Sequence, residues 1–266
     1  MLQQISPQVD VKSFDEIELT DEETKKALDA EKVKKQIRLE YEAKEERRRL
    51  MIEDCYRPWD ANEQYKNSRR IANRIVKTHN PDKVYELDDN AKEVFLALSL
   101  YFANDVRFEE KGYGELYKGI CLTGNVGTGK TLMMYAFSKN KRNCFDIVAA
   151  NKLTDDYIAD GVESLYKYYQ TFKGMLGTYE YFLQKEIGLC IDDIGTEPSP
   201  IKNFGNTINV LEHVIMERYK NKVPLHLTHF TTNLDGDGIE KKYGSRIRSR
   251  LREMVNFIEL KGDDRR

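Results

Sequence analysis

The chain has 266 residues, enough for one medium-sized domain with an additional arm or for two small domains. Its 43 Lys and Arg residues are balanced by 45 Asp and Glu residues, so the net charge of −2 indicates that any nucleic-acid site must be a local patch. The longest mainly apolar run, residues 94–103, is about half as long as a membrane span. Because there is also no secretory signal, we expect a cytoplasmic protein without membrane contact. The four cysteines include no CxxC pair, so we expect neither a disulfide framework nor a zinc ribbon.

Residues 21–50 predict a long, strongly charged helix. Nineteen of these 30 residues are charged, Gly and Pro are absent, and Ala, Glu, Lys and Arg dominate. Val33, Ile37 and Tyr41 form an apolar stripe at i, i+4 and i+8 that is too narrow to be buried in a core of its own. The segment is either a solvated helix or an arm that docks on a partner. We group it with the short helical connector that follows as an N-terminal region, residues 1–88.

Strands and helices alternate in residues 89–266, which predicts an α/β domain. Five runs are expected to be strands: Gly119–Thr123, Cys144–Ala149, Ile187–Ile191, Leu225–Thr231 and Val255–Leu260. The expected helices are Ala91–Ala103, Leu132–Lys139, Thr154–Thr171 and Thr207–Lys220. Such alternation is typical of βαβ units, and it predicts a five-stranded parallel sheet covered by helices on both faces, a three-layer sandwich.

The strongest motif follows the first of these strands and fits the P-loop pattern G-x4-GK[ST]. Its residues are Gly124, Asn125, Val126, Gly127, Thr128, Gly129, Lys130 and Thr131. Glycines let successive backbone N–H groups point at phosphate oxygens, and the helix that begins at Lys130 adds its N-terminal dipole. Lys130 is expected to reach the β- and γ-phosphates, and the Thr131 hydroxyl to bind Mg²⁺. The motif therefore predicts a site for ATP and Mg²⁺.

Polar residues lie at the carboxyl ends of two further predicted strands. Asp192 and Asp193 follow an apolar strand, 62 residues after Lys130. Asp192 suits the position that holds Mg²⁺, and Asp193 suits a carboxylate that orients water or acts as a base. Asn233 follows the next strand, at the carboxyl edge where open α/β sheets bind ligands. It either contacts the γ-phosphate or the attacking water, or it caps the following turn.

These residues together resemble the DnaC/DnaI/IstB branch of AAA+ ATPases. The matching pieces are residues 124–131, Asp192-Asp193-Ile194-Gly195, Glu217-Arg218-Tyr219, Thr231-Thr232-Asn233 and residues 243–251. The resemblance covers roughly residues 90–266. It implies a P-loop AAA+ fold without a C-terminal helical lid, here preceded by a helical N-terminal arm.

The resemblance also implies a nucleotide shared between the subunits of a homo-oligomer. By position, Arg250 is similar to the arginine finger that completes the neighbouring subunit's site, and Arg246 to its companion. The alternative is that both belong to a basic helix face. Arg266 resembles the sensor arginine of the family's tail, with Arg265 as the alternative. Because many AAA+ enzymes have Glu where this chain has Asp193, we expect slow hydrolysis.

Three functions are compatible with this resemblance. The first is an ATPase that loads a replicative helicase onto single-stranded DNA through ATP-gated oligomerisation, with hydrolysis stimulated by DNA or the partner. The second is an IstB-like ATPase that regulates a transposase on duplex DNA. The third is a nucleotide-gated adaptor that binds ATP without useful turnover. In the first, the charged N-terminal helix is the arm that docks on the helicase.

A tyrosine-rich segment between the second and third strands is the candidate contact with single-stranded DNA. Tyr166, Lys167 and Lys173 combine an aromatic ring, on which bases stack, with cations for the phosphates. Neighbouring positions form a stripe at i, i+3, i+4 and i+7 that is typical of a core-facing helix: Leu165, Tyr168, Tyr169 and Phe172. We expect Tyr169 and Phe172 to pack in the core.

Overall fold

The computed structural model describes residues 18–176, 183–203 and 206–264. These residues form two units, Met1–Asp54 and Cys55–Arg266, which we describe one at a time. None of the helices among the described residues is both long and apolar enough to cross a membrane.

The first unit is dominated by helix α1 (Asp21–Tyr56), which confirms the predicted helix and extends it by six residues beyond Leu50. A capping box begins it, because the Glu23 N–H donates to Thr20 Oγ1 while Glu23 Oε2 accepts from the Thr20 N–H. Ion pairs one turn apart, such as Lys26–Glu22 at 2.9 Å, support it along its length. The predicted apolar stripe is exposed, with 61% of Ile37 accessible to solvent.

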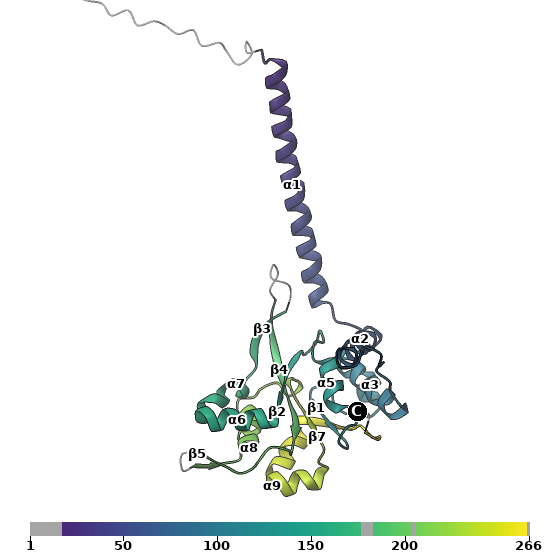
Figure 1. Cartoon of the computed structure of the whole chain (residues 1–266), viewed down its shortest axis with the longest axis vertical. Helices are drawn as coiled ribbons and strands as arrows, with labels where there is room; N and C mark the ends of the chain where they lie inside the picture. Colours follow the sequence, from purple (N-terminus) through teal and green to yellow (C-terminus); the bar gives the residue numbers. More distant parts are fainter. Residues whose placement is uncertain (1–17, 177–182, 204–205, 265–266) are drawn as a thin grey trace, which may run out of the picture. The chain divides into compact units, whose positions relative to one another are not determined.

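The second unit is built on a parallel sheet of five strands (Figure 1). In spatial order these are β2 (Phe145–Ala149), β4 (Leu183–Ile194), β7 (Thr228–Thr232), β1 (Gly119–Thr123) and β8 (Val255–Glu259). The P-loop strand β1 therefore lies between β7 and β8, and its neighbour β7 separates it from the acidic strand β4. The predicted five-stranded parallel α/β sheet, with a P-loop at the end of one of its inner strands, is confirmed.

Helices cover both faces of the sheet and create two cores. Side chains alternate along a strand, so Ile120 and Leu122 join one core while Cys121 joins the other. The first core is closed by α2 (Ala61–His79), α3 (Asp89–Phe102), α4 (Arg107–Glu110) and α5 (Lys130–Phe137). The second is closed by α6 (Ala150–Asp160), α7 (Tyr166–Tyr169), α8 (Val210–Lys220) and α9 (Gly236–Met254). The three-layer sandwich is confirmed.

Several predicted boundaries are wrong for local reasons. The helix expected over 154–171 is broken at Gly161 (φ 72°) into α6, the 3-10 helix η2 (Gly161–Leu165) and the short α7. Two hairpins also went unpredicted: β3 (Phe172–Leu176) pairs antiparallel with β4, and β5 (Ile201–Asn203) pairs with β6 (Asn206–Ile208). Consequently the helix expected from Thr207 begins only at Val210.

The strand expected from Leu225 starts later, because Pro224 is followed by the 3-10 helix η3 (Leu225–Leu227). The compact unit also begins earlier than the predicted division between residues 88 and 89. Helix α2 packs on α3 and α5, and Ala72 is fully buried there. The structure therefore divides the chain after Asp54.

His229, in the central strand β7, is a buried histidine that holds the P-loop strand. Its Nδ1 accepts a hydrogen bond from the Ile120 N–H at 3.1 Å, and its ring lies 4.6 Å from the ring of Phe145. Its Nε2 has no hydrogen-bond partner among the described residues. Burial lowers the pKa of His229 to about 3, so the native state holds this ring neutral.

We expect acid to destabilise the fold through His229. Because its folded pKa lies below the unfolded value, only the unfolded state takes up a proton as the pH falls through about 6.5. Lowering the pH from 7 to 5 should therefore cost about 2 kcal/mol of unfolding free energy at this position. Denaturant titrations of wild type and His229→Gln, in which the amide oxygen can accept the Ile120 bond, should show a flatter pH dependence in the variant. Equal slopes would contradict this.

Candidate nucleotide-binding site

The P-loop connects the end of β1 to the start of α5 through left-handed backbone. Gly127 (φ 80°) and Gly129 (φ 91°) adopt conformations that side chains disfavour, and Gly129 is the N-cap residue directly before the helix. Helix α5 therefore directs its first backbone N–H groups at the loop, where they are available to an anion.

Glycine is also required because the C-terminal segment passes close to the loop. The Leu260 N–H donates to the Thr123 carbonyl at 2.8 Å. A Cβ on Gly124 would lie 2.2 Å from the Leu260 carbonyl oxygen, and one on Gly127 would lie 2.1 Å from Asp264 Oδ1. The end of the described chain thus lies against the phosphate loop. Arg265 and Arg266 lie outside the described residues, and the sensor role of Arg266 stays a prediction.

Lys130 connects the loop to the neighbouring strand end. Its side chain is buried, and Nζ donates to the Gly124 carbonyl at 2.7 Å, the Asn125 carbonyl at 2.8 Å and Asn233 Oδ1 at 2.6 Å. Sequence analysis placed Lys130 and Asn233 in one site, and the structure brings them into direct contact. The amide of Asn233 is a hydrogen-bonding partner of the loop cation.

Asp192 lies beside Thr131 at the end of β4. The Thr131 hydroxyl is 3.0 Å and 3.1 Å from the two carboxylate oxygens, and the Thr231 hydroxyl donates to Asp192 Oδ1 at 2.6 Å. Burial raises the pKa of this carboxyl above its usual range, and the hydrogen bond from Thr231 acts in the opposite direction. A buried carboxylate beside a hydroxyl is an oxygen donor set that suits Mg²⁺, so Thr131 and Asp192 fit the predicted ion.

Asp193 is set apart from Asp192 by its backbone. Its φ of 54° is left-handed, and its N–H donates to Thr231 Oγ1 at 2.8 Å. One threonine on β7 therefore fixes both acidic residues. Sequence analysis included Thr231 in the match Thr231-Thr232-Asn233 but assigned it no role, although a hydroxyl on the strand beside the acidic one is the available signal.

Glu197 is a second residue that the sequence did not reveal. It is 2% exposed, and its carboxylate accepts from the Gly195 N–H at 2.8 Å and from the Tyr243 hydroxyl at 2.5 Å. Lys242 closes the cluster by donating to the carbonyls of Gly195 and Glu197. The loop that follows the acidic strand is thus hydrogen-bonded to helix α9, which carries the predicted arginines.

Arg246 and Arg250 lie beyond a break in α9. Gly244 (φ 85°, ψ 165°) interrupts the helix directly after Tyr243. Arg246 is exposed, whereas Arg250 donates to Glu253 Oε2 at 2.8 Å and lies 4.3 Å from the ring centroid of Tyr219. Among the described residues, neither arginine is hydrogen-bonded to the P-loop or to the acidic strand. Both stay predictions as residues acting on a neighbouring subunit's nucleotide.

The candidate DNA contacts have mixed surroundings. Tyr166 is 60% exposed, as a stacking platform requires, and Tyr169 is buried in the core as expected. Lys167 pairs with the nearly buried Asp156 at 2.8 Å, so part of its role is to stabilise the fold. Lys173 lies in β3, but its side chain is outside the described part, and Phe172 is in the same strand rather than in a helix. The DNA assignment of these residues stays a prediction.

Comparison with known proteins gives distant structural likenesses. No family model and no curated protein matches the chain. A candidate primosome component from Streptococcus pyogenes serotype M3 is 21% identical with a TM-score of 0.43, over 67% of this chain and 84% of that one. DnaA from Aquifex aeolicus bound to AMPPCP is 16% identical (TM-score 0.42), and a DNA replication initiation factor is 15% identical (TM-score 0.44). The matches to DnaA and to the initiation factor each cover 67% of this chain, but only 49% and 48% of those two proteins, so the chain spans about half of their length. At these values the likenesses carry no functional conclusion for this chain.

Replacing Lys130 with Ala should abolish ATP binding, because the loop loses the cation that would contact the phosphates. Charge-assisted hydrogen bonds of about 1.5–3 kcal/mol each predict at least about a tenfold rise in the dissociation constant. Calorimetry with ATP measures it. Lys139→Ala, which removes an exposed lysine just after the same helix, is the matched control. Wild-type affinity in Lys130→Ala would refute the site.

Glu197→Gln should separate binding from turnover. The amide keeps the size of the side chain but offers only one oxygen to two donors, so we expect a loss of about 1–3 kcal/mol of unfolding free energy. Because the side-chain connection of the loop after β4 to Tyr243 of α9 is weakened, leaving the bonds from Lys242 to the loop carbonyls, ATP hydrolysis should fall more than ATP affinity. Steady-state hydrolysis and calorimetry on the same sample give the comparison, with the exposed Glu110→Gln as control. A variant as stable and active as the control would contradict the role.

Proposed function

We propose that the chain is an ATPase of DNA replication that loads a replicative helicase onto single-stranded DNA through ATP-gated assembly. The observation that carries the proposal is the contact of Lys130 with Asn233 at 2.6 Å, next to the pairing of Thr131 with Asp192. Three strand ends thereby supply the groups that a nucleoside triphosphate and its metal ion require. The loading function and the helicase partner rest on the family resemblance.

In this proposal each residue has a separate task. Thr131 and Asp192 would hold Mg²⁺, which supplies charge neutralisation at the β- and γ-phosphates. Lys130 exchanges its loop carbonyls for phosphate oxygens and keeps Asn233 close to the terminal phosphate. Asp193, held at its N–H by Thr231, orients the attacking water. Its carboxylate is shorter than a glutamate, and we therefore infer slow turnover that DNA or the partner stimulates.

The proposed finger, Arg250, is pre-positioned on the surface of the subunit. Its side chain is 35% exposed, and Glu253 and Tyr219 hold it from two sides. A guanidinium fixed in this way loses little conformational entropy when it meets a phosphate. The family resemblance implies that such a finger acts on the nucleotide site of a second copy, and the surface position of Arg250 supports this assignment.

Arg250→Ala should leave the ATP affinity of the monomer unchanged and stop assembly-dependent hydrolysis. An arginine finger accelerates phosphoryl transfer by about 10³-fold or more. Mixing this variant with Lys130→Ala should restore part of the activity, because each protein supplies the half-site that the other lacks. Hydrolysis measured across mixing ratios is the readout, and Arg252→Ala on the same helix is the control. A flat response at every ratio would argue against action in trans.

The partner is tested by removing the N-terminal unit. We expect a chain that begins at Cys55 to retain ATP binding, because the compact unit contains the whole described site. It should lose binding to a purified replicative helicase in a co-sedimentation assay, whereas Ile37→Ala/Tyr41→Ala in the full chain should weaken binding at least about tenfold. The control variant changes exposed charged residues of α1, Lys25→Ala/Glu42→Ala. If helicase binding is unchanged and the protein forms ATP-dependent filaments on duplex DNA, the transposase regulator is supported instead. If ATP is bound but not hydrolysed, even with DNA and the partner present, the nucleotide-gated adaptor is supported.

A further inference from the structure

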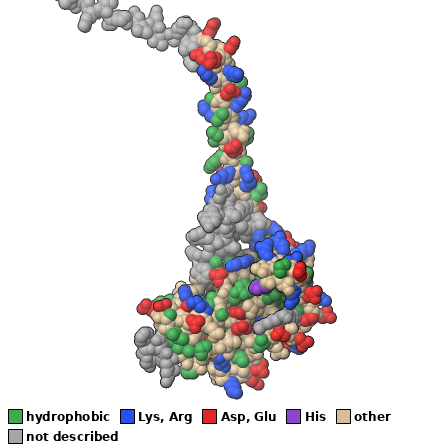
Figure 2. All heavy atoms as spheres, in the orientation of Figure 1, with side chains coloured by type: hydrophobic (Ala, Val, Ile, Leu, Met, Phe, Trp, Pro, Cys, Tyr) green, Lys and Arg blue, Asp and Glu red, His purple; other side chains and the backbone are tan. Residues whose placement is uncertain are grey.

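Helix α2 carries a row of cations on its outward face. Lys66, Arg70, Arg74 and Lys77 stand at i, i+4, i+8 and i+11, so they share one side of the helix over about 16 Å. All four are exposed, and the opposite side of α2 is buried against the rest of the unit. Figure 2 shows Lys and Arg side chains gathered over the part of the compact unit where α2 lies.

The charges on this helix are not balanced locally. Helix α2 has five Lys or Arg residues and a single acidic residue, Glu63, which is bound by Arg57 at 2.9 Å. Within the described residues, no carboxylate forms an ion pair with any of the four cations of the row; Arg70 donates only to the amide oxygen of Asn67. Helix α1 shows the contrast, because several of its lysines and arginines pair with acids one turn away. The positive charge of the row is therefore available to bind an anionic partner.

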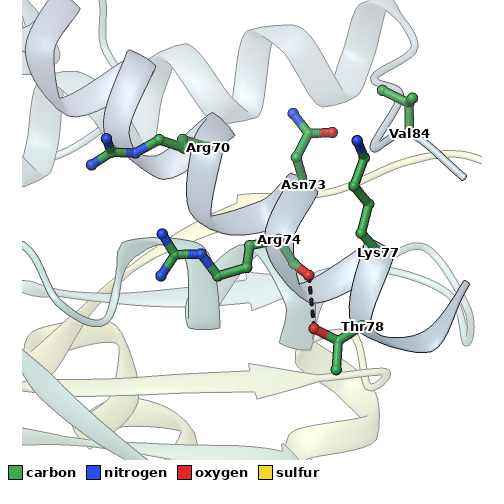
Figure 3. A pocket seen from close by; sticks show the side chains of 6 residues that line it. All are labelled: Arg70, Asn73, Arg74, Lys77, Thr78 and Val84. Atoms are coloured by element: carbon green, nitrogen blue, oxygen red, sulfur yellow. Dashed lines mark hydrogen bonds between the residues drawn. The ribbon is translucent and has the colours of Figure 1, made fainter. Parts of the chain in front are cut away.

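A groove of about 560 Å³ runs along three of the four cations of the row, Arg70, Arg74 and Lys77. Its lining consists of Arg70, Asn73, Arg74, Lys77, Thr78 and Val84. Figure 3 shows Arg70 and Arg74 extending to the same side of α2, while Asn73 and Lys77 point toward Val84. The far wall is the segment after α2, which is fixed because the Tyr85 N–H donates to Asn73 Oδ1 at 2.9 Å and the Arg69 guanidinium lies over the Tyr85 ring.

The chemistry of the lining favours phosphates over other ligands. Arginine, lysine, asparagine and threonine are side chains that contact the nucleic-acid backbone. Among the described residues, no aromatic side chain lines the groove, so the described lining offers bases no stacking surface. A row of about 16 Å can face several successive phosphates, which a small phosphate ligand would not need.

We propose that this groove on α2 is a binding site for the phosphodiester backbone of nucleic acid, occupied without regard to base sequence. It is separate from the P-loop and from the tyrosine-rich segment. Because α2 packs on α5, the helix that starts at the P-loop, the site belongs to the same compact unit as the nucleotide site. The inference shares with the proposed function only the choice of nucleic acid as a partner, and it does not depend on ATP hydrolysis.

The test uses the full chain without nucleotide, and its probes are oligothymidylate of about 20 nucleotides and a mixed-sequence duplex of equal length. Fluorescence anisotropy over a range of salt concentrations gives the affinity and its salt slope. Arg70→Gln/Arg74→Gln is the groove variant, and Lys66→Gln/Lys77→Gln removes the remaining cations of the row independently. The control, Lys111→Gln/Lys220→Gln, makes the same charge change at exposed lysines of α8 and of the turn after α4.

Each of these two double variants of the row, called groove variants from here on, should bind at least one probe on the order of tenfold more weakly at about 0.1 M salt, with a salt slope smaller by about 1.4 for the single strand. The control should change affinity less than about twofold, and all three variants should keep the wild-type unfolding temperature and ATP affinity. The preferred probe identifies the form of nucleic acid. Groove variants that match the control would overturn the proposal. So would binding of polyglutamate but of neither DNA, because it would assign the groove to an acidic protein. Since no nucleotide is present, failure of the ATPase proposal leaves this result unaffected.

Discussion

Asp192 is a carboxylate withdrawn from water at the end of a central strand, and such a group is stable only where hydrogen-bond donors replace the lost water. The hydroxyls of Thr131 and Thr231 supply those donors, and they come from the P-loop helix and from the strand between the two motifs. The need to satisfy this one group therefore fixes β1, β4 and β7 relative to each other. Burial nevertheless keeps the pKa of Asp192 raised, so a divalent cation would relieve a cost that the fold carries without it.

Much of this arrangement follows from the sequence because its signals are local. Five short strands, the glycines of the P-loop and the two aspartates each occupy a few adjacent residues, and parallel strands bring their carboxyl ends to one edge. What the sequence does not show depends on distant partners. From the sequence alone, Glu197 is indistinguishable from an exposed surface acid, because its partner Tyr243 lies 46 residues away. Likewise, nothing local indicates that the hydroxyl of Thr231 is hydrogen-bonded to both Asp192 and Asp193. The exposure of the four cations on α2 cannot be inferred until it is known that the opposite side of this helix packs against the rest of the unit.

The two charged helices show that similar composition produces different surfaces. In α1, acids and bases alternate at one-turn spacing, and each exposed pair contributes only about 0.3–0.5 kcal/mol, so the pairs support the helix without fixing it to a core. Its exposed apolar stripe is the part that a protein partner could bury. Helix α2 has five lysines and arginines but only one acidic residue, and a phosphate backbone complements this positive charge better than an apolar surface does. We therefore infer that the two helices meet different kinds of partner.

The tract Glu217-Arg218-Tyr219 connects the nucleotide site to the proposed finger. Arg218 is fully buried, and it donates to the Thr228 hydroxyl and to the carbonyls of Tyr168 and Leu227, while burial lowers its pKa to about 10. This anchors the end of α8 to the start of β7, the strand that carries Thr231. The adjacent Tyr219 then presents its ring and hydroxyl to Arg250. The Glu197 cluster gives α9 a second connection, to the loop that follows the acidic strand. Through Arg218 and Tyr219 on one side and Glu197 on the other, the helix that carries Arg250 is therefore connected by hydrogen bonds to β7 and to the loop after β4, the two elements that border the nucleotide site.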